Sequence, residues 1–191
     1  HAVKTGMLAN AEIIAAVCVA LRDHDLRNVV VDPVFVAQSG APLIEAHAQK
    51  VLLDDLVPLA RVVTPNLPEA AKLTGYPIES VADMRRAAAW LVDRGARSCL
   101  VKGGHLGGAL AIDVFCDGRD CVELVEERTA TPHTHGTGCQ LSAAITANLA
   151  RGLPLAEAVA GAKQFISVAI RHGLAIGAGD GPANPLAWLD R

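Results

Sequence analysis

Three short aliphatic runs, each ending in a polar residue, constrain the fold of this chain more than any other feature. They occupy residues 29–32, 61–64 and 99–102, and they end in Asp32, Thr64 and Lys102. Apolar residues at helical spacing separate the runs, and strands that alternate with helices are typical of a parallel sheet. Ligands bind such sheets outside the carboxyl ends of the strands. The three polar residues are therefore predicted to meet at one edge of one sheet, with helices on both faces.

The remaining elements follow from periodicity and turn signals. Helices are predicted at about 10–24, 44–56, 80–93 and 155–170, with a further one directly after Gly138. A loop is predicted at 34–43. Asp117-Gly118 is a hairpin signal between strands at 109–115 and 121–125. We therefore predict a single α/β domain over residues 1–191, with a mostly parallel sheet and a late antiparallel hairpin.

The composition argues against several classes of protein. The net charge is −3 without a basic block, which does not fit an electrostatic nucleic-acid interface. No apolar run is long enough to span a membrane, and no signal peptide is visible. The five cysteines include no Cys-x-x-Cys pair, so we expect reduced thiols and a cytoplasmic location.

A glycine-containing stretch before one helix is the main candidate for a ligand site. Gly136 and Gly138 flank Thr137, and Cys139 opens the apolar helical pattern. A helix N-terminus presents unpaired N–H groups and a positive dipole end, and glycine lets a ligand approach the backbone closely. Phosphate is the expected ligand, and the same field favours a thiolate on Cys139. The alternative is a tight turn that lets the helix pack closely, because neither a third dinucleotide-motif glycine nor a Walker P-loop is present.

Two strand ends carry further candidate binding groups. Asn66 and Glu69 are three residues apart, which fits a helix cap and also fits a polar pair that orders Mg²⁺ and its waters. These two interpretations are not exclusive. Lys102 precedes Gly103 and Gly104, and a lysine at the end of a buried strand is expected to meet solvent or an anion. An ordinary exposed lysine at a turn is the alternative.

Five segments in register carry a resemblance over almost the whole chain. They are Lys4-Thr5-Gly6-Met7-Leu8, Val31-Asp32-Pro33-Val34 with Ser39-Gly40, Thr64-Pro65-Asn66-Leu67-Pro68-Glu69, Val101-Lys102-Gly103-Gly104-His105, and Thr134-His135-Gly136-Thr137-Gly138-Cys139 with Leu141-Ser142-Ala143-Ala144. In this order they resemble the hydroxymethylpyrimidine and phosphomethylpyrimidine kinases of thiamine biosynthesis, in the ribokinase-like superfamily. The loop has Cys139 where sugar kinases of the superfamily carry Asp, which indicates the pyrimidine and pyridoxal branch.

The resemblance implies a three-layer α/β/α fold and a kinase that uses ATP and Mg²⁺. Its substrates would be 4-amino-5-hydroxymethyl-2-methylpyrimidine and the monophosphate of that compound. Cys139 would be the general base, and the N–H groups of Gly136, Thr137 and Gly138 would hold the transferring phosphoryl group. His135 would support this loop.

The other candidate residues also take roles from the resemblance. Lys102 would neutralise nucleotide phosphate. Asn66, Thr137 and the two glycines Gly103 and Gly104 would complete the nucleotide site. The remaining two residues, Asp32 and Glu69, would order Mg²⁺ and its waters. The family is commonly dimeric, so a homodimer is expected.

Two alternatives stay open at this stage. A pyridoxal kinase of the same branch shares the Gly-Thr-Gly-Cys loop, and a non-catalytic ligand-binding relative would share the fold. The glycine-rich substrate strand and the lid of the family would lie before His1, so the contacts that separate pyrimidine from pyridoxal are not assigned to residues of this chain. Phe35, where the family usually has Met, and Pro185, where it has His, are peripheral departures.

Overall fold

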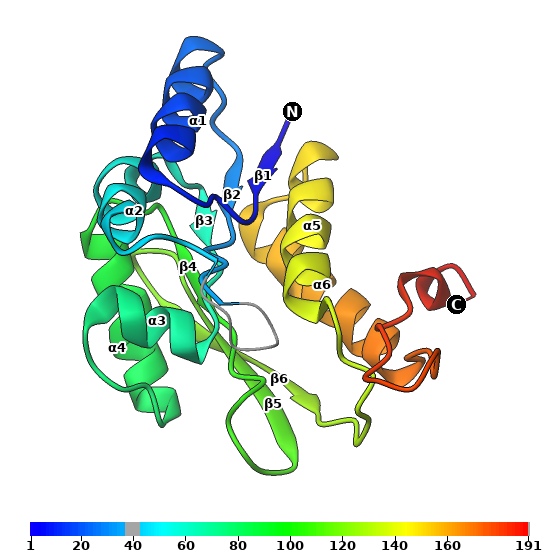
Figure 1. Cartoon of the computed structure of the whole chain (residues 1–191). Helices are drawn as coiled ribbons and strands as arrows, with labels where there is room; N and C mark the ends of the chain where they lie inside the picture. The colour runs from blue at the N-terminus through cyan, green and yellow to red at the C-terminus, as the bar shows by residue number, and fades with distance from the viewer. Residues whose placement is uncertain (37–42, 191) are drawn as a thin grey trace.

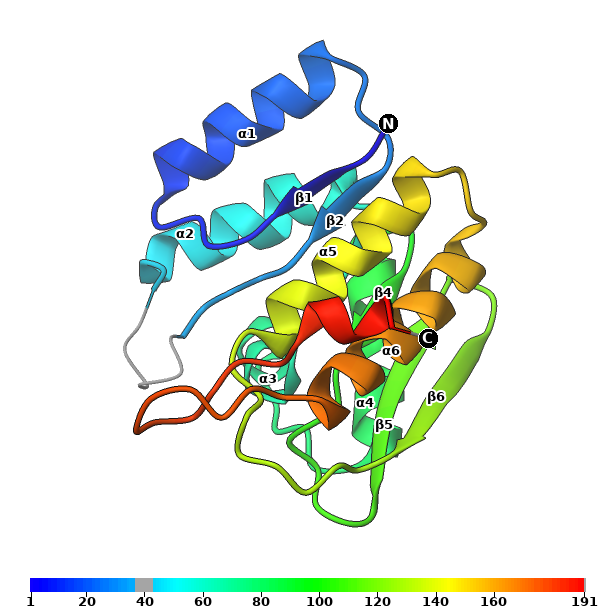
Figure 2. The ribbon, with the colours of Figure 1, turned by 90° about the vertical axis from the view of Figure 1, so that its right-hand side faces the viewer.

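The computed structural model describes residues 1–36 and 43–190, and one six-stranded sheet organises them (Figure 1). The strands lie in sequence order, β1-β2-β3-β4-β5-β6; the first four are parallel, and β5 and β6 are antiparallel. Their bounds are Val3–Thr5, Val29–Val31, Val62–Val63, Cys99–Val101, Leu110–Cys116 and Cys121–Glu127. Figure 2 shows β1 and β6 at opposite edges of this sheet.

Helices cover both faces of the sheet. The first face carries α1 (Ala11–Asp23), α2 (Ala46–Val51), α3 (Leu67–Thr74) and α4 (Val81–Asp93); the second carries α5 (Thr137–Ala150) and α6 (Leu155–Arg171) (Figure 1). Successive strand residues point to opposite faces, so Val29 and Val31 pack with the first layer and Val30 packs with α5 and α6. β2, β3 and β4 are buried on both faces, which is why these strands are apolar, whereas β6 is mostly exposed and carries three glutamates. The three-layer α/β/α prediction is confirmed.

The register brings the three predicted strand ends together. Val31 pairs with Val63, and Val63 pairs with Cys99, all in parallel. Asp32, Thr64 and Lys102 directly follow β2, β3 and β4. They therefore leave the sheet at the same edge. The hairpin of β5 and β6 is confirmed as well, and it pairs along its whole length.

The predicted helix at 44–56 differs from the structure. After α2 the chain continues as a π-helical turn, η1 (Leu52–Leu56), and then as a 3-10 turn, η2 (Val57–Leu59). Pro58 lies in η2 and has no N–H group, so the chain cannot continue as an α-helix there. The predicted loop at 34–43, with its Ser39-Gly40 segment, lies mostly outside the described residues.

The cysteines correct one sequence-based expectation. Cys116 and Cys121 form a disulfide at a directly paired position of β5 and β6, whereas Cys18, Cys99 and Cys139 are free. The expectation of five reduced thiols relied on the absence of a Cys-x-x-Cys pair. The hairpin turn supplies the proximity instead, because it brings the two Cα atoms to 4.1 Å. Among the described residues, no helix combines the length and the hydropathy that a membrane span requires.

Candidate active site

A cavity of about 630 Å³ opens where β2, β3 and β4 end and α5 begins. Nine of the ten predicted site residues line it: Asp32, Asn66, Glu69, Lys102, Gly104, Gly136, Thr137, Gly138 and Cys139. Gly103, the tenth, does not line the cavity. The sequence-based site is therefore one place in space, although its members come from four separate parts of the chain.

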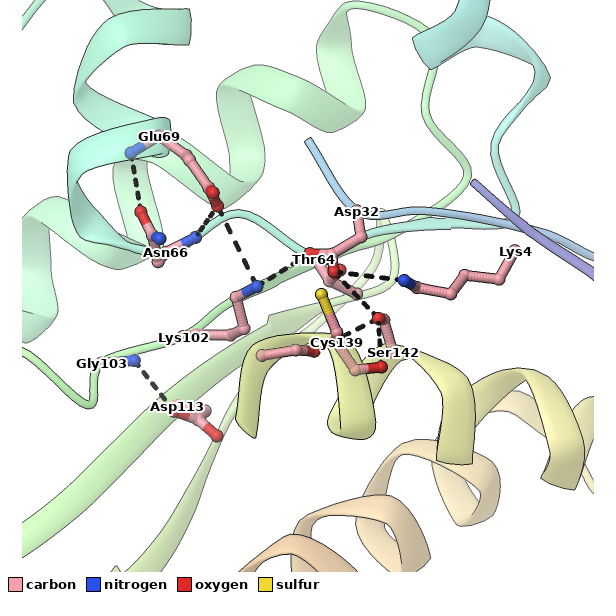
Figure 3. Close-up of polar contacts among 11 residues, drawn as sticks. Lys4, Asp32, Thr64, Asn66, Glu69, Lys102, Gly103, Asp113, Cys139 and Ser142 are labelled. Carbon is pink, nitrogen blue, oxygen red and sulfur yellow. Dashed lines mark hydrogen bonds and ion pairs between the residues drawn. The ribbon is translucent and has the colours of Figure 1, made fainter. Parts of the chain in front are cut away.

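Asp32 is the centre of the polar cluster at the floor of this cavity (Figure 3). One carboxylate oxygen, Oδ1, accepts hydrogen bonds from Thr64 Oγ1 at 3.1 Å and from Lys102 Nζ at 2.9 Å. The other, Oδ2, accepts from Ser142 Oγ at 3.0 Å and lies 3.7 Å from Lys4 Nζ. The side chain is 1% exposed. Both oxygens of Asp32 are thus engaged by the protein itself, and they tie β1, β3, β4 and α5 to the end of β2.

Asn66 and Glu69 form a capping box at the start of α3, as one of the two interpretations predicted. Asn66 Oδ1 accepts from the Glu69 N–H at 2.8 Å, and Glu69 Oε2 accepts from the Asn66 N–H at 2.7 Å. Burial raises the pKa of the Glu69 carboxyl, although the Lys102 ammonium, 4.0 Å away, acts in the opposite direction. The cap explains the Asn66–Glu69 spacing without a metal.

Lys102 is held as an ammonium ion between two carboxylates. Burial alone would lower its pKa, but Asp32 and Glu69 outweigh burial, and the pKa of Lys102 is raised. Its Nζ lies directly against the glycine loop, since a Cβ on Gly138 would come within 3.2 Å of that atom. Cys139 also raises the pKa of Lys102, so the sulfur atom and the ammonium are close enough to interact electrostatically. Gly138 is the residue that gives Lys102 room beside the helix N-terminus.

The N-terminus of α5, unlike Asp32 and the start of α3, has no side-chain capping hydrogen bond from the described residues. Gly136 is the N-cap and has φ of 79°, a left-handed conformation that favours glycine. Among the described residues, no side chain caps this helix. Cys139 is its third residue and is exposed. The Thr137 N–H donates to the Thr134 carbonyl at 3.3 Å, whereas the N–H groups that follow in the first turn have no helix carbonyl four residues before them and can face an anion in the cavity.

The glycine loop is fastened to the C-terminal tail. His133 Nδ1 accepts a hydrogen bond from the Gly181 N–H at 3.0 Å. The His135 N–H donates to the Gly181 carbonyl at 3.2 Å, and the Ala183 N–H donates to the His135 carbonyl at 3.4 Å. These bonds join the loop to a segment up to 48 residues later in the chain and limit its movement.

The two glycines after Lys102 have different environments. Gly103 donates its N–H to Asp113 Oδ1 at 2.9 Å, and a Cβ there would overlap the Ile112 carbonyl oxygen. A Cβ on Gly104 would meet nothing within 4 Å, and Gly104 lines the cavity. Gly103 is thus required by the packing of β4 against β5, whereas Gly104 borders the space for a ligand.

Sequence reasoning missed a buried ion pair on the wall of the cavity. Lys163 of α6 donates to Asp113 Oδ2 at 2.8 Å and to the Ala111 carbonyl at 3.0 Å. Both charged side chains are less than 10% exposed. Each stands alone in an apolar stretch of sequence, and that was the available signal: buried charges are usually paired. Lys4 and Ser142 were also missed as partners of Asp32.

The arrangement suits transfer of a charged group to a hydroxyl. An anion-binding helix N-terminus, an ammonium beside it and an exposed thiol meet at one end of the cavity. The described residues contain no group of three or more His, Cys, Asp or Glu side chains that could hold a metal ion directly. Asp32 in particular is 1% exposed and already accepts three hydrogen bonds.

Comparison with known proteins agrees with this geometry. Residues 1–184 match the family model described as phosphomethylpyrimidine kinase. The chain is 48% identical over 182 residues to the thiamine biosynthesis bifunctional protein ThiED of Geobacter sulfurreducens, covering 95% of this chain and 37% of that protein. It is 47% identical over 190 residues to the hydroxymethylpyrimidine/phosphomethylpyrimidine kinase of Haemophilus influenzae, covering 97% of this chain and 70% of that protein.

A solved structure is also similar. An ADP complex of Bacillus subtilis pyridoxal kinase matches with a TM-score of 0.93 and 38% sequence identity, and the match covers 100% of this chain and 72% of that one. The fold is therefore shared with a pyridoxal kinase that was crystallised with ADP, while the Haemophilus influenzae pyrimidine kinase is more similar in sequence.

Proposed function

Because the chain belongs to the phosphomethylpyrimidine kinase family, we propose that it transfers the γ-phosphoryl group of ATP to a hydroxymethylpyrimidine and to its monophosphate. The observation that carries the proposal is the open N-terminus of α5, with Lys102 Nζ against Gly138 and Cys139 in the first turn. Phosphoryl transfer relies on positioning and charge stabilisation, and this end of the cavity offers both.

The chemical step assigns a role to each residue of the loop. An oxygen of the substrate's hydroxymethyl group, or of its phosphate in the second phosphorylation, attacks the γ-phosphorus. Cys139 takes the proton from the attacking group, and the bond from the γ-phosphorus to its bridging oxygen breaks to leave ADP. The N–H groups of Gly136, Thr137 and Gly138 hold the charge on the transferring group. Lys102 neutralises nucleotide phosphate.

The nucleotide is proposed to lie along the wall formed by Gly104 on one side and the start of α5 on the other. Asn66 and Thr137 border the same cavity. The Bacillus subtilis pyridoxal kinase was crystallised with ADP, which supports a nucleotide in the corresponding place here. Gly103 is proposed to contribute to nucleotide binding only indirectly, because its hydrogen bond to Asp113 fixes the loop that contains Gly104.

Mg²⁺ is proposed to act with Asp32 and Glu69 through its waters. Contact through water fits Asp32 better than direct coordination, because this carboxylate is 1% exposed and already accepts three hydrogen bonds. Mg²⁺ usually keeps several waters, and both carboxylates border the cavity. When bound with ATP, the ion would neutralise phosphate charge. Glu69→Gln is expected to raise the Mg²⁺ concentration for half-maximal activity by about 10–100-fold, as for other groups that orient metal-bound water. An unchanged Mg²⁺ requirement in a folded, active variant would exclude this role.

The substrate preference follows from the degree of similarity. Curated relatives named as hydroxymethylpyrimidine/phosphomethylpyrimidine kinases are 42–50% identical to this chain, against 38% for the Bacillus subtilis pyridoxal kinase structure. We assign the pyrimidine as the substrate and keep pyridoxal as the second candidate, because the shared fold favours it. We further propose one kinase domain that forms a homodimer in the cytoplasm, and light scattering of the purified protein tests the dimer.

The test is a direct assay of the full-length protein with ATP. Hydroxymethylpyrimidine, its monophosphate and pyridoxal are supplied separately, and products are identified by mass spectrometry. We expect kcat/KM for the pyrimidine to exceed that for pyridoxal by about tenfold or more, a difference that a few altered pocket contacts supply. A preference for pyridoxal would favour the second candidate. Binding of ATP without transfer to any of the three would indicate a non-catalytic relative.

A further inference from the structure

The loop between β4 and β5, residues 102–109, forms one wall of the cavity but has little structure of its own. Gly104 and His105 line the cavity. Three of the six loop residues after Lys102 and Gly103 are glycines, and Gly108 has φ of 99°. Within the loop, the Leu106 N–H donates to the Gly103 carbonyl at 2.9 Å. Glycine-rich segments lose much backbone freedom on ordering, so an outside partner is needed to fix such a loop.

Arg128, which follows β6 directly, is that partner. Its Nη1 donates to the Gly104 carbonyl at 2.7 Å, and its Nε donates to the Gly108 carbonyl at 2.9 Å. Its Nη2 donates to the carbonyls of Leu106 and Leu110, the latter at 3.2 Å. The backbone N–H of Arg128 donates to the Ala109 carbonyl at 2.8 Å. The loop therefore wraps around one guanidinium group.

The geometry requires arginine rather than any cation. Four carbonyl oxygens that converge without a donor would repel one another and would need water. A guanidinium has five N–H donors in a planar fork and can serve several carbonyls at fixed directions, whereas an ammonium has three donors at a single point. Arg128 is only partly buried, so these bonds give the loop its shape rather than fill the core.

The start of the loop is fixed independently. Asp113 accepts the Gly103 N–H, and Lys163 holds Asp113 in turn. Arg128 governs the part beyond Gly103, which includes the two residues that line the cavity. Asp113 therefore fixes the start of the loop at Gly103, and Arg128 fixes the residues after it.

We propose that Arg128 is a positioning residue for the nucleotide: through the carbonyls of residues 104–110 it holds Gly104 and His105 in the arrangement that receives ATP. The inference rests on the proposed function, because it takes the ligand at this wall to be a nucleotide. Arg128 itself does not line the cavity and is not a catalytic residue.

The test separates ATP binding from chemistry. Arg128→Met and Arg128→Lys are compared with the wild type by calorimetry with ATP and by steady-state kinetics. If the loop spends about a tenth of its time in the competent arrangement, the apparent Kd and KM for ATP rise about tenfold. We expect kcat and the KM for the pyrimidine to stay within about threefold, since Cys139 and the α5 N-terminus are untouched. Hydrogen exchange at the amides of residues 104–109 should become faster in both variants.

Arg119→Met is the matched control. Arg119 is exposed at the opposite end of the same hairpin, so its replacement should leave the Kd for ATP and the exchange of the loop at wild-type values. A folded Arg128→Met variant with wild-type ATP affinity would overturn the inference, as would a loss of kcat with an unchanged KM for ATP. If Arg128→Met does not fold, Arg128→Lys decides by the same criteria. A wild-type protein that binds no ATP would refute the proposed function before any variant is made, and the inference with it.

Discussion

The strand ends around Asp32 and the start of α5 border the same cavity. They differ in how many of their polar groups have hydrogen-bond partners within the protein. At the strand ends, the Asp32 carboxylate is 1% exposed and is bonded to Thr64, Lys102 and Ser142. At the start of α5, no described side chain caps the helix, and Cys139 is exposed. The first region is complete without a ligand, whereas the second has hydrogen-bonding groups that only a ligand or water can satisfy.

This difference separates residues that build the site from residues that act on substrate. A buried charge with all its partners present contributes order, and its removal leaves other charges unpaired. An exposed group at a helix end contributes little to stability, so its presence at that position is explained by what it binds. We therefore expect substitutions at the strand ends to cost stability first, and substitutions at the loop to cost activity first.

The largest effect on stability is expected for Asp32→Ala. The substitution removes the shared partner of Lys102, Lys4 and Ser142 in a buried place, and breaking one side of a buried ion pair costs about 3–5 kcal/mol. Urea unfolding measures the loss. Arg27→Ala is the control, because Arg27 is 71% exposed in its pair with Asp25 and a solvent-exposed ion pair contributes little to stability. Equal losses in the two variants would contradict the distinction between the regions.

A smaller effect is expected where the two regions touch. The methyl group of Gly138→Ala would lie 3.2 Å from Lys102 Nζ, which Asp32 holds at 2.9 Å on its other side. Overpacking of this kind typically costs about 1–3 kcal/mol, and the displaced ammonium should lower turnover as well. Gly104→Ala is the control for stability, since a Cβ there has no neighbour within 4 Å. Gly138→Ala with the stability and turnover of the wild type would show that Lys102 moves aside freely.

The smallest effect is a pH dependence of opposite sign at two helix caps. Burial raises the pKa of Glu69 above its ordinary 4.5, so the folded state binds its proton more tightly than the unfolded state does. Its contribution to the free energy of unfolding is full below pH 4.5 and is lost as the pH rises through the raised pKa. Asp83 occupies the same third position of α4, but a hydrogen bond from Ser80 lowers its pKa below 3.8. Its contribution is present above pH 3.8 and is lost as the pH falls.

Urea unfolding of Glu69→Gln and Asp83→Asn against pH checks both signs. The stability of the wild type relative to Glu69→Gln should fall as the pH rises from acid to neutral. The stability of the wild type relative to Asp83→Asn should rise over the acid range. The same sign in both differences would mean that burial does not govern the titration of Glu69.

The sequence predicted what depends on local pattern. Burial on both faces explains the apolar runs of β2, β3 and β4, and turn chemistry explains the hairpin. The rule that parallel strands end at one edge of the sheet predicted that Asp32, Thr64 and Lys102 lie together. The Asn66 cap followed from its spacing to Glu69. Each of these features depends on neighbouring residues in the sequence or on a general rule of parallel sheets, so one sequence is enough to predict it.

The parts that were missed depend on contacts between distant segments. Ser142 reaches Asp32 across 110 positions of sequence, and Lys163 reaches Asp113 across 50. Neither partner could be chosen among many residues from one sequence alone. The role of Gly138 was understood only in part, because the space beside it holds Lys102 Nζ in addition to facing the anion site.

The most direct test of the account is Cys139→Ser, measured for stability, ATP binding and turnover in the same preparation. The side chain is exposed, so the free energy of unfolding should stay within about 0.5 kcal/mol of the wild type, and the Kd for ATP should not change. Turnover should fall by about 10²–10⁴, the range for loss of a general base, because a serine hydroxyl stays protonated at neutral pH. A Cys139→Ser protein that turns over at the wild-type rate would contradict the account and place the base elsewhere.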